Sequence, residues 1–406
     1  MANTAAAAAT QQDLTVPSHI PPEMVLDFDL FGQDPLFEED LYKGLEGLAA
    51  EQRDIFYTPR NGGAWIVCGH KATFDAARDT ELFSNSPLHR YDIPQEMIQI
   101  PISIDAPAHT AYRQVLMKAF APKVVGGLEP AIRALTHELI DEILAKGSCD
   151  FVKDVSEPLP VLIFMRLMGF PESYLPQFRS WILKAISEPD PAQRQLVWDE
   201  VLKITAVLLE ERQAEPQDDL MSRLIAAEID GRPPTFAELQ SYCLMLFNAG
   251  LDTVVNGMSL AFHHLAMDQD LQARLRADPS GINDAIEEIL RRYTFTSPPR
   301  FITRDADFMG APLRKGDFVI LLLPAANLDP RAFQAPTEVR PEREETHIAF
   351  NSGPHRCVGS HLARLELRVL YEVWLERVPQ FRLGDTPWTY HTGFVFSVDS
   401  LPLRWD

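Results

Sequence analysis

The sequence contains few cysteines, and they lie too far apart to form a disulfide framework or a zinc site. The 406 residues include four cysteines, and no C-x-x-C pair occurs among them. A disulfide-rich secreted domain and a zinc knuckle are therefore not indicated. A reducing compartment, the cytoplasm, is expected, and an inert buried thiol is the default for each cysteine. The four are Cys68, Cys149, Cys243 and Cys357.

Positive charge is also scarce. The 37 Lys and Arg residues stand against 58 Asp and Glu, which leaves a formal net charge of −21 at pH 7. An acidic surface repels phosphate backbones and anionic lipids, so neither nucleic acid nor a membrane is expected as a partner. The 46% hydrophobic and 23% charged residues fit a soluble globular chain.

The N-terminal region lacks the marks of a targeting signal. No Lys or Arg precedes Lys43, and no apolar run of about 20 residues occurs at this end. We expect residues 1–20 to form a flexible arm and residues 21–406 to form a single domain.

Helical periodicity dominates the chain, and strand patterns are few. A small β-hairpin is predicted from 55–58 and 64–68 around Asn61-Gly62-Gly63, and a second strand pair within 307–324 around Lys315-Gly316-Asp317. The sequence thus predicts a mainly α protein with a minor β region. Predicted helices cover 108–120, 126–146, 155–169, 193–214, 235–267, 281–293 and 359–378.

The helix predicted over 235–267 is long and apolar on nearly all faces. A membrane span is the first alternative, but Asp252 in its middle would be costly in lipid. A helix through the centre of a soluble core is the better interpretation.

Cys357 lies in a loop that contains Gly and Pro, just before the helix predicted over 359–378. Free N–H groups at a helix N-terminus favour a thiolate, Gly353 and Gly359 permit close approach of a flat ligand, and Phe350 offers an apolar wall. A thiolate in such a loop is a good axial ligand for haem iron. The alternative is an ordinary buried cysteine beside an ordinary turn, but the joint spacing of Phe, Gly, His, Cys and Gly disfavours it.

This spacing, F-x-x-G-x-H-x-C-x-G, resembles the haem-binding signature of the cytochrome P450 superfamily, the haem-thiolate monooxygenases. The resemblance implies haem b with Cys357 as the proximal iron ligand and His355 at a haem propionate. It also implies the family's fold, with the haem between the long central helix and the cysteine-loop helix. Asn351 stands where a second glycine is common in the family.

The long helix carries Ala249-Gly250-Leu251-Asp252-Thr253. A glycine inside a helix costs about 1 kcal/mol relative to alanine, and a gap in the helix wall over a ligand would explain it. The alternative is a tolerated glycine with a helix-facing threonine. The stretch resembles the family motif whose acid–alcohol pair directs protons, which implies catalytic roles for Asp252 and Thr253.

Two further pairs of residues have helical spacing: one suits the binding of carboxylates, and the other suits a structural ion pair. His109 and Arg113 lie four apart, so on a helix they share a face suited to carboxylates; a surface helix capped by Asp105 is the alternative. Glu288 could pair with Arg291 or Arg292 by spacing alone. The resemblance selects Arg291 and adds Arg343 as structural partners, and it implies propionate contacts for His109, Arg113 and Arg300.

Within the superfamily, the chain looks most like the soluble bacterial camphor monooxygenase. The substrate-binding tyrosine of that enzyme aligns with Met97, which cannot donate to a ketone, so camphor itself is in doubt. Tyr91 or Asn248 could supply a donor instead. The substrate-contacting residues implied by the resemblance are Leu88, Tyr91, Met97, Met245, Asn248, Ala249, Thr296, Phe394 and Val395.

These features lead us to expect a monooxygenase that hydroxylates a small apolar, terpenoid-like compound with O₂. Because no flavin or nicotinamide fingerprint is present, electrons would come from a [2Fe–2S] ferredoxin and its NAD(P)H-dependent reductase. A peroxide-using haem-thiolate peroxygenase and a non-enzymatic haem sensor or carrier are the alternatives. The pair Asp252-Thr253 argues against the first, and the lack of a segment for an output domain argues against the second.

Overall fold

The computed structural model describes residues 15–32, 34, 37, 40–91, 98–178, 180–181 and 191–406. Helices predominate in this part of the chain. They are α1 (Lys43–Ala50), α2 (His70–Arg78), α3 (Ala108–Ala119), α4 (Pro122–Gly126), α5 (Glu129–Leu144), α6 (Pro158–Met168), α8 (Pro191–Ala214), α9 (Leu220–Ile225), α10 (Phe236–Gly250), α11 (Asp252–Met267), α12 (Gln269–Ala277), α13 (Ile282–Arg292), α14 (Leu323–Ala326) and α15 (Ser360–Arg377).

The strands form small sheets. The largest has the order β1-β2-β8-β5-β3, in which only the β2–β8 pair is parallel. Its strands are β1 (Ile55–Thr58), β2 (Ala64–Val67), β8 (Phe318–Leu321), β5 (Pro299–Ile302) and β3 (Phe83–Ser84). The others pair as β4 (Ser148–Asp150) with β12 (Pro402–Trp405) and β9 (Phe381–Leu383), β10 (Thr389–His391) with β11 (Ser397–Ser400), and β6 (Ala306–Phe308) with β7 (Ala311–Leu313).

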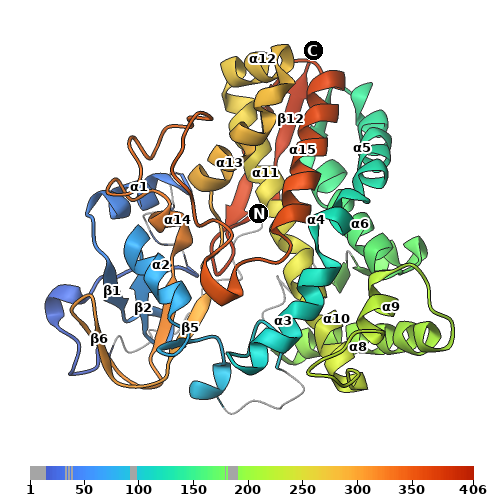
Figure 1. Cartoon of the computed structure of the whole chain (residues 1–406). Helices are drawn as coiled ribbons and strands as arrows, with labels where there is room; N and C mark the ends of the chain where they lie inside the picture. The colour runs from blue at the N-terminus through green and yellow to red at the C-terminus, as the bar shows by residue number, and fades with distance from the viewer. Residues whose placement is uncertain are drawn as a thin grey trace.

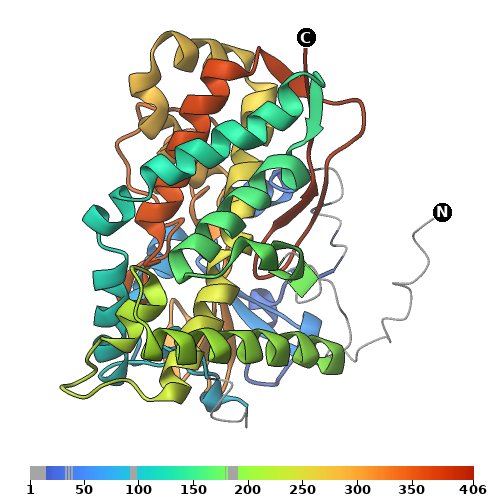
Figure 2. The same cartoon turned by 90° about the vertical axis from the view of Figure 1, so that its right-hand side faces the viewer.

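Three apolar clusters hold these elements together. One surrounds the large sheet and α2, a second joins α3, α6, α8, α9 and α10, and a third joins α5, α11, α13 and α15. Figure 1 shows the largest sheet on one side of the molecule, beside α1, α2 and α14, and most of the other helices on the other side, with α11 at the centre behind α15. Figure 2 shows α5 and α6 on the outer side of this helical layer, with α8 lying across its lower edge.

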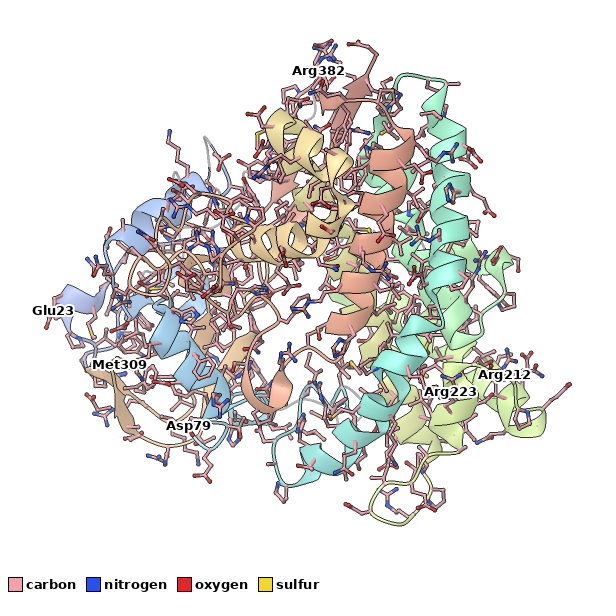
Figure 3. All side chains as sticks on the ribbon, turned by 45° about the horizontal axis from the view of Figure 1, so that its top comes forward. Glu23, Asp79, Arg212, Arg223, Met309 and Arg382 are labelled. Atoms are coloured by element: carbon pink, nitrogen blue, oxygen red, sulfur yellow. The ribbon has the colours of Figure 1, made fainter. Side chains whose placement is uncertain are left out.

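Charged side chains lie on the surface of the protein, and some of them form hydrogen bonds that join neighbouring helices. At the end of α8, Arg212 donates to Asp219 at 2.5 Å and to the Gly169 carbonyl at 2.9 Å, which ties α6, α8 and α9. Figure 3 shows Arg212 beside Arg223 at this edge, far from Arg382 at the opposite end of the molecule.

The predicted hairpin of 55–58 and 64–68 is confirmed, since β1 and β2 pair antiparallel around Asn61. The second strand pair is wrong in its pairing. Residues 315–317 do form a turn, but β7 before it pairs with β6, and β8 after it pairs with β2 and β5. The strand β8 is apolar on successive residues because it lies inside a sheet, which local alternation could not reveal. Residues 323–326 then form α14 rather than extending the strand.

The predicted helix 235–267 is two helices, α10 and α11, interrupted at Leu251. Here the Thr253 hydroxyl donates to the Ala249 carbonyl at 2.9 Å, and the Asn256 amide donates to the Asp252 carbonyl at 2.9 Å. Side-chain donors that engage carbonyls four residues back bend helices. The interruption also falls where the chain leaves the cluster containing Leu251 and enters the one containing Val255.

Among the described residues, the stretch 236–267 is long and apolar enough to cross a membrane by length and composition alone. Two thirds of its most apolar window, 67%, is buried inside the fold. This burial fits the interpretation of a core helix. The helix predicted over 126–146 begins later, because α4 ends at Gly126 and α5 starts at Glu129.

The pairing of Glu288 with Arg291 is observed at the core of the fold. Arg291 is 0% exposed and donates to both Glu288 oxygens at 2.8 Å, while Arg343 donates to them at 2.9 and 3.1 Å. Arg292, the alternative partner, instead bonds Glu46 and the Thr337 carbonyl. Burial alone would raise the pKa of Glu288, but the hydrogen bonds and charge of Arg291, with Arg343, hold it below its ordinary value.

Candidate active site

The loop before α15 is fixed by its own backbone. The N–H of Cys357 donates to the Phe350 carbonyl at 2.9 Å, and the N–H of Arg356 donates to the Gly353 carbonyl at 3.1 Å. The guanidinium of Arg364 stacks 4.4 Å over the Phe350 ring and bonds both oxygens of Glu287 at 2.5 and 2.7 Å. Cys357 is thereby held three residues before the first turn of α15.

Gly353 serves the protein's own packing rather than only a ligand. Its φ is +70°, and a Cβ there would lie 2.6 Å from the Ala77 carbonyl oxygen on α2. Gly250 is different, because a Cβ there would meet only the Phe164 ring at 3.6 Å, an ordinary contact. The close approach expected at Gly353 is therefore an approach to α2, and Gly250 has room for a methyl group.

This contrast gives a matched pair of substitutions. Gly353→Ala is expected to destabilise the protein by roughly 1–3 kcal/mol, because it adds a strained left-handed residue and a backbone overlap. Gly250→Ala is expected to stabilise it by about 0.5–1 kcal/mol by lowering the entropy of the unfolded chain. Chemical denaturation of the two variants beside the parent protein measures both. A Gly353→Ala variant as stable as the parent would contradict the close contact with Ala77.

The environment of Cys357 contains opposing influences on its thiol. The residue presents accessible surface, yet it lies deep among protein atoms, and this burial raises the pKa of the thiol. The N–H of Gly359 donates to the sulfur, and the charges of Arg113, Arg356 and Arg364 act in the same direction to lower the pKa. The sequence-based expectation that N–H groups before α15 reach the sulfur agrees with this geometry.

Polar residues gather beside this loop. The rings of His109 and His355 lie 4.2 Å apart. Asp105 accepts hydrogen bonds from the Ser84 hydroxyl and from the Asn85 N–H at 3.0 Å, and its Oδ1 lies 3.7 Å from His355 Nε2. The Asp105 side chain therefore does not cap the helix at 108–119, which corrects that alternative.

Among the residues that the structure describes, several buried nitrogen atoms in this group have no hydrogen-bond partner. They are Nε and Nη2 of Arg300 and Nε2 of His109, while Nε2 of His355 has only the Asp105 Oδ1 atom, 3.7 Å away. Arg300 is 1% exposed, and burial lowers its pKa to about 10. Burial, together with the nearby charges of His355 and Arg113, lowers the pKa of His109 to about 4. Buried donors without acceptors are costly and rare, so this cluster calls for an anionic partner.

The two carboxylates of a porphyrin fit this donor set. Arg113, whose Nη2 bonds the Arg356 carbonyl, lies close enough to Cys357 to act on its thiol, so donors and sulfur belong to one site. A guanidinium and imidazoles are the groups that hold carboxylates best. The residues present therefore fit a haem whose iron faces Cys357.

The family resemblance places the other side of the site at the junction of α10 and α11. Asn248 and Ala249 are exposed in the middle of an otherwise buried helix pair. Val358, which follows Cys357, packs against the same apolar cluster as Leu251. Burial raises the pKa of Asp252, while its hydrogen bond with Asn256 and the charge of His391 oppose that shift.

The expected substrate contacts are brought together only in part. Thr296 and Val395 form an antiparallel bridge, and the Phe394 ring lies 4.8 Å from Phe31 and 6.2 Å from Phe318. Tyr91 lies 5.8 Å from Phe301, and Asn248 donates to Gln99 at 3.2 Å. Leu88 is 52% exposed.

Two of these residues stand apart. Met245 is only 5% exposed, and it packs within the cluster that joins α6, α8 and α10. Met97 lies outside the described residues.

Sequence reasoning missed Asp105 as a member of the site, and it did not single out Glu366, His391 or Asp399. Asp105 was considered only as a helix cap, because nothing local reveals that its carboxylate turns toward His355. Glu366 on α15 is 1% exposed, and burial raises its pKa to about 8, which keeps the carboxyl protonated at neutral pH. His391 and Asp399 lie far along the chain from Asp252, and no motif connects them.

Fold and site together define a haem-thiolate protein, and comparison with known proteins confirms the class. The cytochrome P450 family model matches residues 132–280 and 282–387. The chain belongs to the cytochrome P450 family, whose members are oxidoreductases that use haem with an axial cysteine thiolate, O₂ and a redox partner.

Individual relatives cover nearly the whole chain. A probable cytochrome P450 127A1 of Sinorhizobium fredii is 32% identical over 96% of this chain and 97% of its own. A steroid C26-monooxygenase of Mycobacterium tuberculosis (strain CDC 1551 / Oshkosh) is 33% identical over 86% of this chain and 96% of its own. The crystal structure of cytochrome P450 CYP101C1 is 33% identical, covers 97% of this chain and 100% of its own, and superposes with a TM-score of 0.89. The predicted fold class is thereby confirmed.

Proposed function

We propose that this monooxygenase binds haem b through the Cys357 thiolate and hydroxylates a small apolar, terpenoid-like compound. The observation that carries the proposal is the set of buried nitrogens of His109 and Arg300 beside the cysteine loop, which have no hydrogen-bond partner among the described residues and lie next to His355. Haem, when bound, supplies the oxidising chemistry, and the protein supplies the thiolate, an apolar site and protons.

In this proposal each hydrogen-bond donor near the cysteine loop has a role in holding the haem. His109, Arg113, Arg300 and His355 bind the two propionates, and Asp105 orients His355. Phe350 and Gly359 shape the cysteine side, where the Gly359 N–H stabilises sulfur charge. Gly353 acts indirectly, since its contact with α2 holds the loop in place.

Protons reach the site through the α10–α11 junction. Asp252 can hold a proton because burial raises its pKa, and the Thr253 hydroxyl lies in the same turn. In the described structure that hydroxyl donates to the Ala249 carbonyl, which orients its oxygen lone pairs as acceptors. Gly250 and Ala249 form the wall at this point, and Gly250 is the last residue of α10.

Thr253→Ala is expected to raise NADH consumption per product formed by about tenfold, because it removes the hydroxyl oxygen that accepts hydrogen bonds in the proton path, and a positioned acid–base group contributes about 10²–10⁴-fold to a rate. NADH oxidation and product are measured together in a system reconstituted with a [2Fe–2S] ferredoxin and its reductase. Thr253→Ser keeps the hydroxyl and serves as the control. Equal coupling in the alanine variant would count against the proton role.

The substrate class is inferred from the side chains at the site. Phe394 and Val395 are apolar, Tyr91 and Asn248 offer single polar contacts, and no exposed charge is among the expected contacts that the structure describes. Such a lining favours an apolar ring compound with few polar groups. Relatives carry names for steroid and polyketide substrates, so larger compounds are the competing class.

Spectral titration distinguishes these classes, because a compound that enters the pocket shifts the haem absorption band. Monoterpenes are expected to give a saturating shift at lower concentration than steroids or macrolides. A larger shift with steroids and none with monoterpenes would overturn the terpenoid assignment.

A ferredoxin is the proposed electron donor, and it would approach the cysteine side. Lys118 and Arg356 are exposed there, and Arg113 is partly buried behind them. Arg364 contributes less than its charge suggests, since Glu287 neutralises it. A small local basic surface on an acidic protein suits an acidic ferredoxin.

A further inference from the structure

The hairpin of β10 and β11 carries a charged pair close to the start of α11. The Nδ1 atom of His391 lies 2.9 Å from the Asp399 Oδ1 atom. Both side chains face water, with 45% and 50% of their surfaces exposed. The pair therefore exchanges protons freely with solvent, and it belongs to no motif recognised in the sequence.

Asn256 fastens this hairpin to the turn that contains Asp252. Its amide nitrogen donates to the Asp252 carbonyl at 2.9 Å and to the Ser397 hydroxyl at 3.3 Å, and its amide oxygen accepts from the Val398 N–H at 2.9 Å. Asn256 is 1% exposed, so these bonds are shielded from water.

The strand register then sets the position of the histidine. His391 is the direct partner of Ser397 across the hairpin. Ser397 in turn contacts Asn256, which is bonded to Asp252. The imidazole is consequently placed beside the first turn of α11, at a distance where its charge acts on the Asp252 carboxyl.

Among the residues that the structure describes, a small set of ionisable groups acts on Asp252 and His391. Asp252 is influenced by burial, by its bond with Asn256, and by the charges of His391 and Asp399. The bond to Asp399 and the charge of Asp252 raise the pKa of His391, while burial opposes them. The charges of Asp252 and His391 thus act on each other in both directions.

We propose that His391, held by Asp399, is a positioning residue that sets the charge of Asp252 and connects it to the pH of the solvent. This rests on the proposed role of Asp252 as a proton carrier. While the imidazole is protonated, its positive charge favours the Asp252 carboxylate. As the pH rises through the raised pKa of His391, that charge is lost, and Asp252 holds its proton to higher pH.

The direct test is an NMR titration of histidine ring signals in the haem-loaded, reduced, carbon monoxide-bound protein with ¹³C-labelled histidine. The signal of His391 is assigned by its loss in His391→Gln. Asp399→Asn and Asp252→Asn are each expected to lower the pKa of His391, because each removes a negative charge beside it. Asp385→Asn, which removes a carboxylate paired with Arg404, should leave it unchanged. An unmoved pKa of His391 in Asp252→Asn would overturn the proposal.

A kinetic test adds a second readout. The rate of product formation in the parent protein is expected to change slope at the pKa that NMR gives for His391, and His391→Gln should lose that feature while keeping full haem content. The same slope change in His391→Gln would overturn the proposal. If Asp252→Asn turned over at the parent rate, the proton role of Asp252 would be wrong. The NMR titration needs no turnover, so it would still test whether Asp252 changes the pKa of His391 even if Asp252 carries no proton in the reaction.

Discussion

Replacing Cys357 with serine is expected to abolish turnover and to remove the red-shifted absorption band that the reduced protein gives under carbon monoxide. That band depends on an anionic sulfur ligand, and a serine hydroxyl does not ionise in this environment. The loop itself should persist, because its fixing bonds are backbone bonds from Cys357 to Phe350 and from Arg356 to Gly353. Absorbance spectra and product formation, measured on the same preparation, check both expectations.

Cys149→Ser is the matched control for this experiment. Cys149 is partly buried in β4, which pairs with β12. Its removal should leave the band intact. A normal band in Cys357→Ser, or loss of the band in Cys149→Ser, would show that the thiolate ligand lies elsewhere.

Arg291→Ala is expected to cost roughly 3–5 kcal/mol of unfolding free energy, which is a large part of the about 5–15 kcal/mol of a typical domain. Arg343 remains beside Glu288, so the carboxylate keeps one partner. The loss arises because Arg291 also donates to three backbone carbonyls, which a methyl group leaves without donors. These belong to Asn327, Pro336 and Glu338.

Denaturant unfolding of Arg291→Ala measures this cost, with Arg382→Ala as the control. Arg382 pairs with Asp406 at the exposed end of the molecule, so its removal should change stability little (Figure 3). A loss as small in Arg291→Ala as in Arg382→Ala would contradict the buried network.

The same network predicts how stability depends on pH. The folded protein lowers the pKa of Glu288 below its unfolded value, so the carboxylate contributes stability above the unfolded pKa. That contribution is lost as the pH falls through the lowered, folded pKa. Because Asn327 also accepts the Ile348 N–H at 3.0 Å, loss of the network loosens the chain that leads into the cysteine loop.

The sequence by itself determined the class of the protein and the local parts of its site. Phe350 to Gly359 form one short loop that leads directly into a helix. The position of the cysteine ligand and the start of that helix could therefore be predicted from neighbouring residues. The pair Glu288 and Arg291 is also local, three residues apart on one helix face. Periodicity found most helices, because one buried face repeats every 3.6 residues.

Only the tertiary structure decided the parts that depend on distant segments. The pairing of β8 with β2 joins residues more than 250 positions apart, and no local pattern encodes it. The helix is interrupted at Leu251, where α10 leaves one apolar cluster and α11 enters another. The sequence is apolar on both sides of this point, so it gives no sign of the interruption. Asp105 beside His355, and His391 beside Asp252, likewise arise from packing, since the charge that a residue feels is set by its neighbours in space.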